Sequence, residues 1–301
     1  MASTQTDEDK RKLLKPKVST DDALAILNEF YTSDSQKAEV VRELDSYDDA
    51  NYLVKIDGIK ALLKIHNGVE SEKYIKRHST KKAKLNDGES VEGSIIDLHT
   101  AIFEHLAREE FKVTTCKTIP ALASQEDGDN SVSVKELPVV SSEHSPKKLV
   151  IRLCAWVHGI PLSSTKYFPL EVLVDAGTYL GRMCHALDDL AASNPAALEL
   201  SKTYHAWDGR NLVDAMRYVE HIDDPQRRKL VTSVIDTFRQ VIIDGGEGKK
   251  FRWGVNHGDF NDANIIVSDH DNTGTRVAGA IDFGDTIYRY LFCPVNTAPA
   301  R

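Results

Sequence analysis

Cysteine is scarce in this sequence, and the few cysteines lie far apart. The four residues, Cys116, Cys154, Cys184 and Cys293, form no CxxC pair. Their scatter excludes the usual spacing of a zinc site and gives no pattern for a disulfide framework. We therefore expect the thiols to be buried.

The chain also lacks an excess of basic residues and a long apolar run. Its formal net charge is −8 at pH 7, which argues against a nucleic-acid binder that works through a general basic field. One of its most apolar runs, LVIRLCAWV at 149–157, is short and contains Arg152, so no membrane segment is expected. Residues 1–17 have no apolar core of signal-peptide length. The expected location is the cytoplasm.

The chain is long enough for one large or two modest globular units, with 301 residues of which 41% are hydrophobic and 28% charged. Residues 1–18 are polar and charged, and we expect a disordered tail there. Strand patterns dominate residues 19–156, and helical patterns dominate residues 157–301. We place the hinge between the two parts near residues 155–159.

Local patterns predict the elements of the first part. A helix is expected to begin at Ser19 or Thr20, because Asp21 and Asp22 in its first turn interact favourably with the helix dipole. AspGly at 57–58, between alternating apolar runs, is a good hairpin signal. The strands are predicted at 38–44, 52–56, 60–66, 132–139 and 149–156, and a helix at 93–110.

Between the third strand and that helix, residues 72–85 are basic and are interpreted as a solvated surface insertion, with a phosphate or acidic-partner site as the alternative. In the second part, helical periodicity predicts helices at 171–190, 211–222 and 225–243. Pro225 begins the last of these helices.

The stretch NHGDFNDANIIVSDHDNTGTRVAGAIDFGD, residues 256–285, carries the pattern with the most chemistry. Two β-rich runs around a polar, Gly-containing segment predict a hairpin. If its loop folds symmetrically about Thr273, Asn264 and Asp282 face each other at the open end. An amide oxygen and a carboxylate are hard ligands that suit Mg²⁺. Asp259, five residues before Asn264, then lies close to the metal and is placed to accept the proton of a substrate hydroxyl.

HGDFNDAN followed by IDFGD resembles the catalytic loop and metal-binding motif of protein-kinase-like enzymes. The HisGlyAsp form is similar to the branch of aminoglycoside phosphotransferases and choline kinases, which phosphorylate small hydroxylated molecules. The resemblance implies an α+β fold of two lobes, with a small antiparallel-sheet N-lobe and a mainly helical C-lobe. It also implies that Asp259 is the base and that Asn264 and Asp282 bind Mg²⁺.

Lys64 lies inside the strand predicted at 60–66, where alternation puts it on one face with Leu62. A solvated face is the ordinary interpretation of such a lysine. The resemblance instead implies a lysine that binds the α- and β-phosphates and pairs with an acidic residue of the following helix. Asp97 is the first choice for that partner and Glu104 the second.

The hinge is expected to receive the nucleotide base through backbone groups. We place this contact at Ala155 and Val157, and a contact through backbone groups would explain why no special side chain is visible at residues 155–159.

The turn between the first two strands, LDSYDDAN at residues 44–51, contains no glycine, which excludes the flexible glycine-rich cradle of protein kinases. A polar turn can still present backbone N–H groups and the Ser46 hydroxyl to phosphate, although a plain hairpin turn is an equal alternative. SYDDANY is similar to a segment of the hydroxylysine kinase branch of the same family. This resemblance implies nucleotide-binding roles for Ser46 and Tyr47, GTP as the donor with ATP as the alternative, and the 5-hydroxyl of hydroxylysine as the acceptor.

Two other functions stay open. Another small amino alcohol is the alternative acceptor, such as choline, ethanolamine, homoserine or an aminoglycoside. The chain ends sixteen residues after Asp285, whereas the resembled family continues with several helices. We therefore expect a shortened form whose helices at 171–243 expose apolar surface, and a non-catalytic nucleotide-binding protein is the second alternative.

Overall fold

The chain forms two compact units in the computed structural model. The structure describes residues 7–82, 94–122, 131–167, 169–202, 204, 208–268 and 276–290. Unit 1 consists of Met1–Ala107 and Thr115–Val157, and unit 2 consists of Arg108–Thr114 and His158–Arg301. The main division between them thus falls between Val157 and His158.

Unit 1 is built on an antiparallel sheet with the strand order β1-β2-β3-β6-β4, in which β5 also pairs with β6. Its strands are β1 Ala38–Leu44, β2 Ala50–Ile56, β3 Ile59–Ile65, β4 Thr118–Ile119, β5 Ser133–Leu137 and β6 Lys147–Ala155. The predicted AspGly hairpin is confirmed, because Asp57 and Gly58 connect β2 and β3 with positive φ angles of 50° and 82°.

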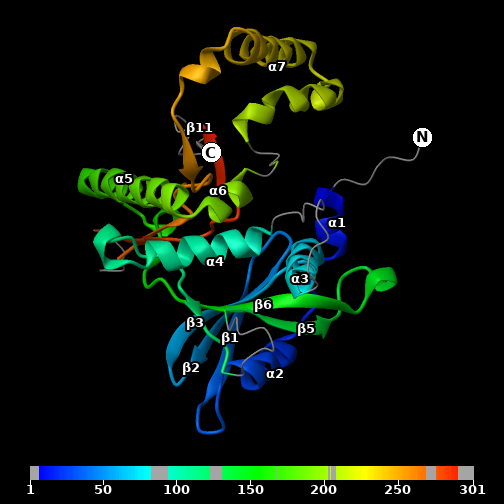
Figure 1. The fold of residues 1–301 in the computed structure, drawn as a ribbon, viewed down its shortest axis with the longest axis vertical. Helices are drawn as coiled ribbons and strands as arrows, with labels where there is room; N and C mark the ends of the chain where they lie inside the picture. Colours follow the sequence, from blue (N-terminus) through cyan, green and yellow to red (C-terminus); the bar gives the residue numbers. More distant parts are fainter. Residues whose placement is uncertain are drawn as a thin grey trace. The chain divides into compact units, whose positions relative to one another are not determined.

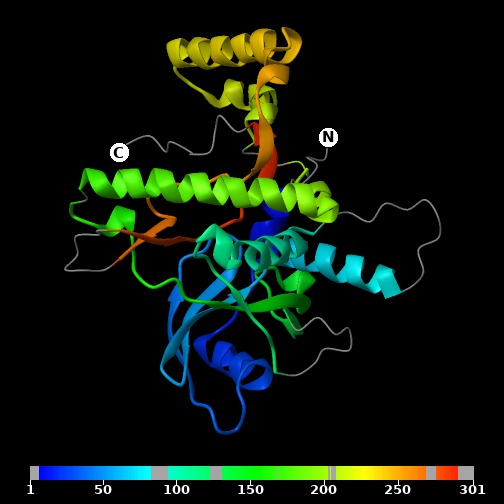
Figure 2. The ribbon, with the colours of Figure 1, turned by 60° about the vertical axis from the view of Figure 1, so that its left-hand side comes forward.

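Helices cover both faces of this sheet, as Figures 1 and 2 show. Helix α2, Thr20–Phe30, packs its apolar residues against the side chains of Leu63 and Ile65. On the other face, α3 Gly68–Lys82 and α4 Ile95–Leu106 pack around Val150. The alternation along β3 and β6 therefore separates two small cores, and the residues on one face of each strand meet α2.

The start of α2 is confirmed at the predicted position. The Ser19 side chain accepts a hydrogen bond from the N–H of Asp22 at 3.1 Å, and the Asp22 carboxylate accepts one from the N–H of Ser19 at 3.0 Å. This reciprocal capping box satisfies two N–H groups that the helix itself leaves unpaired.

The prediction of a disordered tail over residues 1–18 is wrong for the described part of that range. Residues Asp7–Leu13 form α1, and the chain after it continues along residues 138–141 of the same unit. The N–H of Lys17 donates to the carbonyl of Pro138 at 2.9 Å, and Pro16 bridges Val139. The composition is polar, but Leu14 is buried in the sheet core, which supplies the anchoring that composition alone does not reveal.

The basic residues 72–85 are likewise not a surface insertion over their described part. They continue α3 up to Lys82, and Tyr74 of this helix is buried beside Ile96 of α4. Because basic residues dominate this segment, its few apolar residues give only a weak helical pattern in the sequence.

Unit 2 is mainly helical in its described part, with two small sheets. Its helices are the 3₁₀-helices η1 Glu109–Phe111, η3 Leu162–Ser164, η4 Gly209–His221 and η6 Glu247–Lys250, the α-helices α5 Leu170–Ser193, α6 Pro195–Ser201 and α7 Pro225–Phe238, and the π-helix η5 Arg239–Asp244. Strands β7 Ile160–Pro161, β9 Ile265–Val267 and β10 Val277–Ala280 form one sheet, and β8 Trp253–Asn256 pairs with β11 Ile287–Tyr290. The predicted helices at 171–190 and 225–243 are confirmed, and the one at 211–222 is a 3₁₀-helix.

Helix α5 holds the β9–β10 hairpin of unit 2 in position. The Asp175 carboxylate accepts a hydrogen bond from the N–H of Val277 at 2.7 Å. The Tyr179 side chain stacks on Phe260, with ring centroids 6.1 Å apart. None of the helices in the described ranges combines the length and apolarity that a membrane span requires.

Candidate active site

The carboxylate of Asp259 is held on both of its oxygens. Strand β8 leads into the loop that carries it, and the Asn261 side-chain amide donates to Oδ1 at 2.9 Å. The Asn264 amide donates to Oδ2 at 3.0 Å and to the Asp259 backbone carbonyl at 2.9 Å. The loop thus fixes the direction of a half-buried carboxylate before any substrate is bound.

His257 links this loop to the segment around Asp282. Its Nε2–H donates to the carbonyl of Ile281 at 3.0 Å, and its Nδ1 accepts from the N–H of Asp259 at 3.3 Å. One donating and one accepting nitrogen describe a neutral imidazole. Burial lowers the pKa of His257, although the carboxylates of Asp282 and nearby aspartates act in the opposite direction. We therefore assign His257 a structural role and not that of a base.

Gly258 lets two loops approach each other closely. Its φ is 88°, and a Cβ atom there would lie 2.1 Å from the carbonyl oxygen of Asp285. A side chain would meet both a strained backbone and an occupied position. The glycine of the HisGlyAsp motif is therefore explained by its packing against the segment that follows Asp282.

The predicted hairpin at 264–282 is confirmed, but its predicted register is off by one residue. Strand β9 pairs with β10, and the carbonyl of Asn264 accepts from the N–H of Ile281 at 3.0 Å. Asn264 therefore lies opposite Ile281 and not opposite Asp282. The register shifts between Val277 and Gly279, where β10 advances by two residues while β9 advances by one. Such an extra residue on one strand is a β-bulge. Thr273, the predicted centre of the loop, lies outside the described residues.

Asp282 follows directly after this pairing and adopts an unusual backbone conformation. Its φ is 60°, in the left-handed region that aspartate tolerates better than most residues. The exposed carboxylate accepts from the N–H of Gly284 at 3.3 Å. The next residue, Phe283, is buried against the His257 ring, with centroids 4.4 Å apart. The turn therefore directs one side chain inward and leaves the carboxylate of Asp282 accessible.

The donor set around Asn264 and Asp282 fits Mg²⁺. Both of the amide hydrogens of Asn264 face Asp259 through the bonds described above, so its oxygen is the atom available to a cation. The carboxylate of Asp282 supplies a second hard oxygen one residue beyond the strand pairing. Two protein oxygens suit an ion that keeps several waters and binds substrate phosphates.

In unit 1, the phosphate lysine predicted at position 64 has a different partner from the one expected. The Lys64 ammonium lies 2.6 Å from Oδ2 of Asp49, which belongs to the turn between β1 and β2. Asp97 instead contacts Arg77 at 3.2 Å and His78 at 2.8 Å. The expected Lys64–Asp97 pair is therefore corrected to Lys64–Asp49.

The second choice, Glu104, is exposed on α4. Asp97 is occupied because α3, which the sequence did not predict, presents Arg77 and His78 to the first turn of α4.

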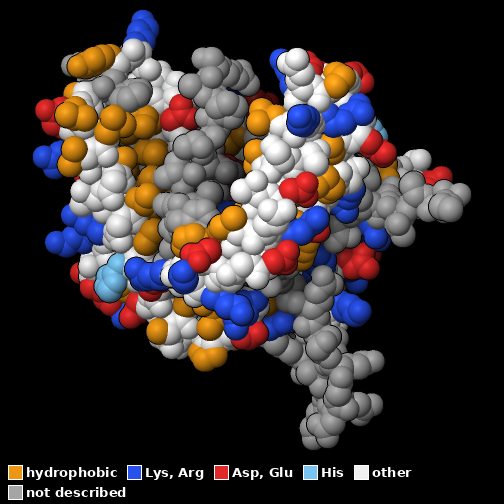
Figure 3. All heavy atoms as spheres, turned by 90° about the horizontal axis from the view of Figure 1, so that it is seen from above, with side chains coloured by type: hydrophobic (Ala, Val, Ile, Leu, Met, Phe, Trp, Pro, Cys, Tyr) orange, Lys and Arg blue, Asp and Glu red, His pale blue; other side chains and the backbone are white. Residues whose placement is uncertain are grey.

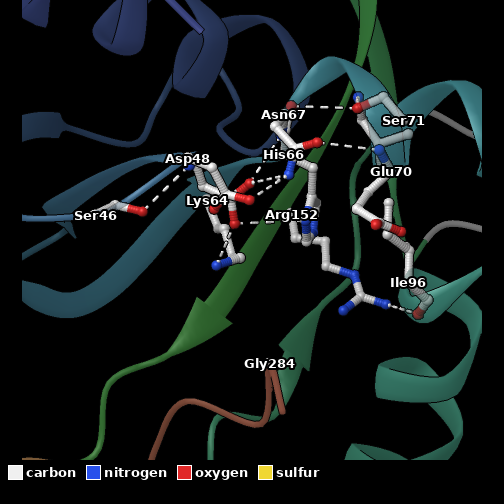
Figure 4. Close-up of polar contacts among 12 residues, drawn as sticks. Ser46, Asp48, Lys64, His66, Asn67, Glu70, Ser71, Ile96, Arg152 and Gly284 are labelled. Atoms are coloured by element: carbon white, nitrogen blue, oxygen red, sulfur yellow. Dashed lines mark hydrogen bonds and ion pairs between the residues drawn. The ribbon is translucent and has the colours of Figure 1, made fainter. Parts of the chain in front are cut away.

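Asn67 completes the surroundings of Asp49, which is only 7% exposed. The backbone N–H of Asn67 donates to Asp49 Oδ1 at 2.8 Å and its side-chain amide donates to the same oxygen at 3.1 Å. Figure 4 shows this group, with Lys64 on β3 directed toward the turn and Asn67 beyond the end of the strand. One oxygen of Asp49 is thus fixed by Asn67 and the other faces Lys64.

The turn from Ser46 to Asp49 has two backbone N–H groups at its centre that are available to a ligand. The Ser46 hydroxyl accepts from the N–H of Asp49 at 3.3 Å, and the Tyr47 side chain is 58% exposed. Within the described residues, no hydrogen bond uses the N–H of Tyr47 or of Asp48. Two adjacent, unengaged N–H groups are the feature that lets a concave turn accept an anion.

The hinge residues lie at the end of unit 1. Ala155 is the last residue of β6, and its N–H donates to the carbonyl of Lys117 at 2.7 Å. Val157 is buried two residues later. The N–H of Ala155 is therefore engaged in the unit itself, and any base contact at this residue falls to its carbonyl.

Three site residues, Asp49, Asn67 and Asn261, were missed from the sequence. Asp49 lies inside the SYDDANY motif, but the family resemblance points to the following helix, and not to this turn, for the carboxylate partner of Lys64. Asn261 lies inside HGDFNDAN, and its side-chain oxygen accepts from the N–H of Ala263, two residues on, at 2.9 Å. The available signal was therefore the tendency of asparagine to form such an Asx turn.

Comparison with known proteins places most of the chain in one family. Residues 40–293 match the model of the Phosphotransferase enzyme family. The hydroxylysine kinase of Bos taurus is 26% identical over 293 residues, which cover 96% of this chain and 70% of that protein. The hydroxylysine kinase of Danio rerio is 24% identical over 280 residues, which cover 92% and 68%.

Solved structures agree on the fold. The GDP complex of wild-type aminoglycoside 2'-phosphotransferase-IIIa matches with a TM-score of 0.52 at 12% identity, over 88% of this chain and 72% of that one. A microcompartment-associated aminopropanol kinase matches with a TM-score of 0.52 at 20% identity, over 90% and 70%. The predicted α+β fold of the kinase-like, aminoglycoside phosphotransferase type is confirmed.

Proposed function

We propose, because this chain belongs to the phosphotransferase enzyme family, that it transfers the γ-phosphate of a nucleoside triphosphate to a hydroxyl group of a small amine or amino acid. The observation that carries the proposal is the Asp259 carboxylate, held by Asn261 and Asn264 in a loop that His257 links to Ile281, the residue before Asp282. A fixed acceptor of a proton beside two hard oxygen ligands is the arrangement that phosphoryl transfer to an alcohol requires.

The 5-hydroxyl of hydroxylysine is the acceptor that we favour. Relatives with that name align with more than nine-tenths of this chain in Bos taurus and Danio rerio. GTP is the favoured donor and ATP the alternative, and the structure with a TM-score of 0.52 that contains GDP supports a guanine nucleotide. The cytoplasmic location inferred from the sequence stays a prediction.

In the proposed reaction, Asp259 orients the acceptor hydroxyl and takes its proton. The acceptor oxygen forms a bond to the γ-phosphorus, and the bond from that phosphorus to the bridging oxygen breaks, which releases the nucleoside diphosphate. Lys64, Ser46 and Tyr47 are assigned to the donor phosphates. Asn264 and Asp282 would hold Mg²⁺, which supplies charge neutralisation on the phosphate oxygens when it is bound.

Replacement of the proposed base tests this function. Asp259→Asn preserves the size of the side chain but removes its ability to take a proton, so turnover of GTP with hydroxylysine should fall by roughly 10³-fold. Nucleotide affinity should stay unchanged. The matched control is Asp262→Asn, which changes an exposed carboxylate in the same loop and should keep full turnover. Equal turnover of Asp259→Asn and the unmodified protein would contradict the assignment of the base.

A panel of acceptors separates the alternatives. Choline, ethanolamine, homoserine and an aminoglycoside should be poorer acceptors than hydroxylysine, and a better one would replace it as the substrate. Thermal unfolding of the same sample with Mg²⁺ and nucleotide measures binding independently. Stabilisation by nucleotide without transfer to any acceptor would indicate a non-catalytic nucleotide-binding protein.

A further inference from the structure

The proposed phosphate turn contains two carboxylates, and this composition conflicts with its proposed ligand. Asp48 and Asp49 follow Ser46 and Tyr47 directly, so two negative charges accompany the N–H groups that would face a triphosphate. Like charges at such short range repel strongly. The turn can serve a donor nucleotide only if both carboxylates are compensated by cations.

Both carboxylates do have a cation, but the two cations come from different parts of unit 1. Asp49 contacts Lys64 of β3 at 2.6 Å. Asp48 contacts the Arg11 guanidinium of α1 at 3.1 Å, and the other end of the same guanidinium pairs with Glu70 of α3. Arg11 thus adds a second cation to the turn, in direct contact with Asp48, beside the Lys64 ammonium on Asp49.

Two further basic residues of the N-terminal segment contact the same turn, and their order along the chain is opposite to that of the turn residues they contact. The Lys12 ammonium lies 4.9 Å from the centre of the Tyr47 ring, within the range of a cation–π interaction. The Lys15 ammonium donates to the carbonyl of Ser46 at 2.5 Å. Residues 48, 47 and 46 are therefore contacted in turn by residues 11, 12 and 15.

The segment that carries these cations is firmly attached to unit 1. The carbonyl of Leu14 accepts from the N–H of Gly68 at 2.9 Å, and that of Lys15 accepts from the N–H of Val140 at 3.0 Å. Leu14 is buried, and a Cβ atom at Gly68 would lie 2.9 Å from its Cβ. The cations are consequently presented from a fixed backbone and not from a mobile tail.

We propose that Arg11, Lys12 and Lys15 form a basic strap that is part of the donor-nucleotide site, and that Arg11 makes the acidic turn compatible with the phosphates by compensating Asp48. This inference rests on the proposed function. The strap replaces the flexibility of a glycine-rich loop by holding a glycine-free turn in one conformation, with the N–H groups of Tyr47 and Asp48 unengaged within the described residues. Its ligand is the triphosphate group of a nucleotide.

Neutralisation of Arg11 tests the proposal through the phosphate dependence of binding. Isothermal titration measures the affinity for GTP with Mg²⁺, for GDP and for guanosine, with the adenine series in parallel. Arg11→Gln should weaken triphosphate binding roughly tenfold through the uncompensated charge of Asp48 and leave nucleoside binding unchanged. The control Lys17→Gln removes the same charge from an exposed side chain that contacts no residue of the turn in the described structure, and should bind like the unmodified protein.

The double variant Arg11→Gln/Asp48→Asn distinguishes compensation from general damage. Because it removes the charge that Arg11 compensates, it should restore triphosphate affinity to within about twofold of the unmodified protein. Asp48→Asn alone, which keeps Arg11, should bind triphosphate at least as tightly as the unmodified protein and serves as the test if Arg11→Gln does not fold. Equal weakening for nucleoside and triphosphate, no rescue in the double variant, or weaker triphosphate binding by Asp48→Asn would overturn the inference. No nucleotide binding by the unmodified protein would overturn the proposed function itself.

Discussion

Gly258 is the residue at which the candidate site tolerates least change. Gly258→Ala adds a methyl group 2.1 Å from the carbonyl of Asp285 at a φ of 88°. The atom that the methyl group would meet belongs to the backbone and cannot rotate away as a side chain can. We therefore expect a loss of at least about 3 kcal/mol in the free energy of unfolding. Turnover should be abolished, since the loops that carry Asp259 and Asp282 must separate. Denaturant unfolding of the variant measures the effect.

Gly246 provides the matched control for this prediction. It also has a positive φ, 73°, but a Cβ atom there would meet nothing within 4 Å. Gly246→Ala should therefore cost only the strain of the left-handed conformation, about 1 kcal/mol. Equal losses for the two variants would show that the close approach of Gly258 to Asp285 is unimportant.

Single residues were predictable from the sequence where a motif fixes both type and spacing. Asp259, Asn264 and Asp282 were identified in this way, and the structure brings the first two into direct contact. The orientation of Asp282 was not predictable, because it depends on a register shift in β10 and on a positive φ at a residue other than glycine. Neither feature has a signal in the residue pattern.

At the scale of elements, the turn between β1 and β2 and the strand β3 act together through Asp49 and Lys64. Asp49→Asn removes the charge opposite Lys64 but keeps an oxygen that can accept from Asn67. We expect a loss of about 2–3 kcal/mol in stability, below the range for a fully buried pair because a quarter of the Lys64 side chain is exposed. The KM for the donor nucleotide should rise, because the lysine loses its orientation, while kcat changes less.

Asp97→Asn is the matched control for this element, since the sequence had placed the lysine partner there. It removes a carboxylate that contacts Arg77 and His78, so stability should fall by about 1 kcal/mol without a change in donor KM. Steady-state kinetics with varied nucleotide compare the two variants. A higher donor KM for Asp97→Asn than for Asp49→Asn would indicate that Asp97 of α4, and not Asp49, is the functional partner of Lys64.

The pH dependence of stability gives a second measure of the Asp49 pair. Burial alone would raise the pKa of Asp49, but Lys64, His66 and the hydrogen bonds from Lys64 and Asn67 lower it below its ordinary value. A lowered pKa stabilises the fold above the ordinary aspartate range, near pH 3.9, and this contribution is lost as the pH falls further. Asp49→Asn should therefore reduce the slope of the acid limb of the stability curve.

Elements with strong local signals were predictable, and those stabilised by distant contacts were not. The AspGly turn, the Ser19 cap and the apolar alternation of β3 are local, and each is found where it was predicted. Helices α1 and α3 are polar or basic in sequence, and they are stabilised by a few partners far along the chain, such as Asp48 for Arg11. Composition therefore suggested a tail and an insertion.

On the scale of the whole molecule, the two units differ in how well their helices are covered. In unit 1, α2 and α4 bury their apolar faces. In unit 2, Leu230 and Val234 of α7 are 63% and 53% exposed. Figure 3 shows hydrophobic side chains among charged ones on the face of the molecule that it presents.

Because this face of α7 is exposed, we expect polar substitutions on it to reduce self-association without changing the free energy of unfolding. Leu230 and Val234 are four residues apart and share one side of α7, whereas Ile235 is the buried residue of that helix. The double variant Leu230→Gln/Val234→Gln should reduce concentration-dependent self-association in sedimentation velocity, because it removes apolar surface from contact with water. Its free energy of unfolding should stay within about 0.5 kcal/mol of the unmodified protein.

Ile235→Gln, the control at the buried position, should lose about 3 kcal/mol. A comparable loss in the double variant would mean that Leu230 and Val234 pack against other parts of the protein in solution, and that α7 is covered after all.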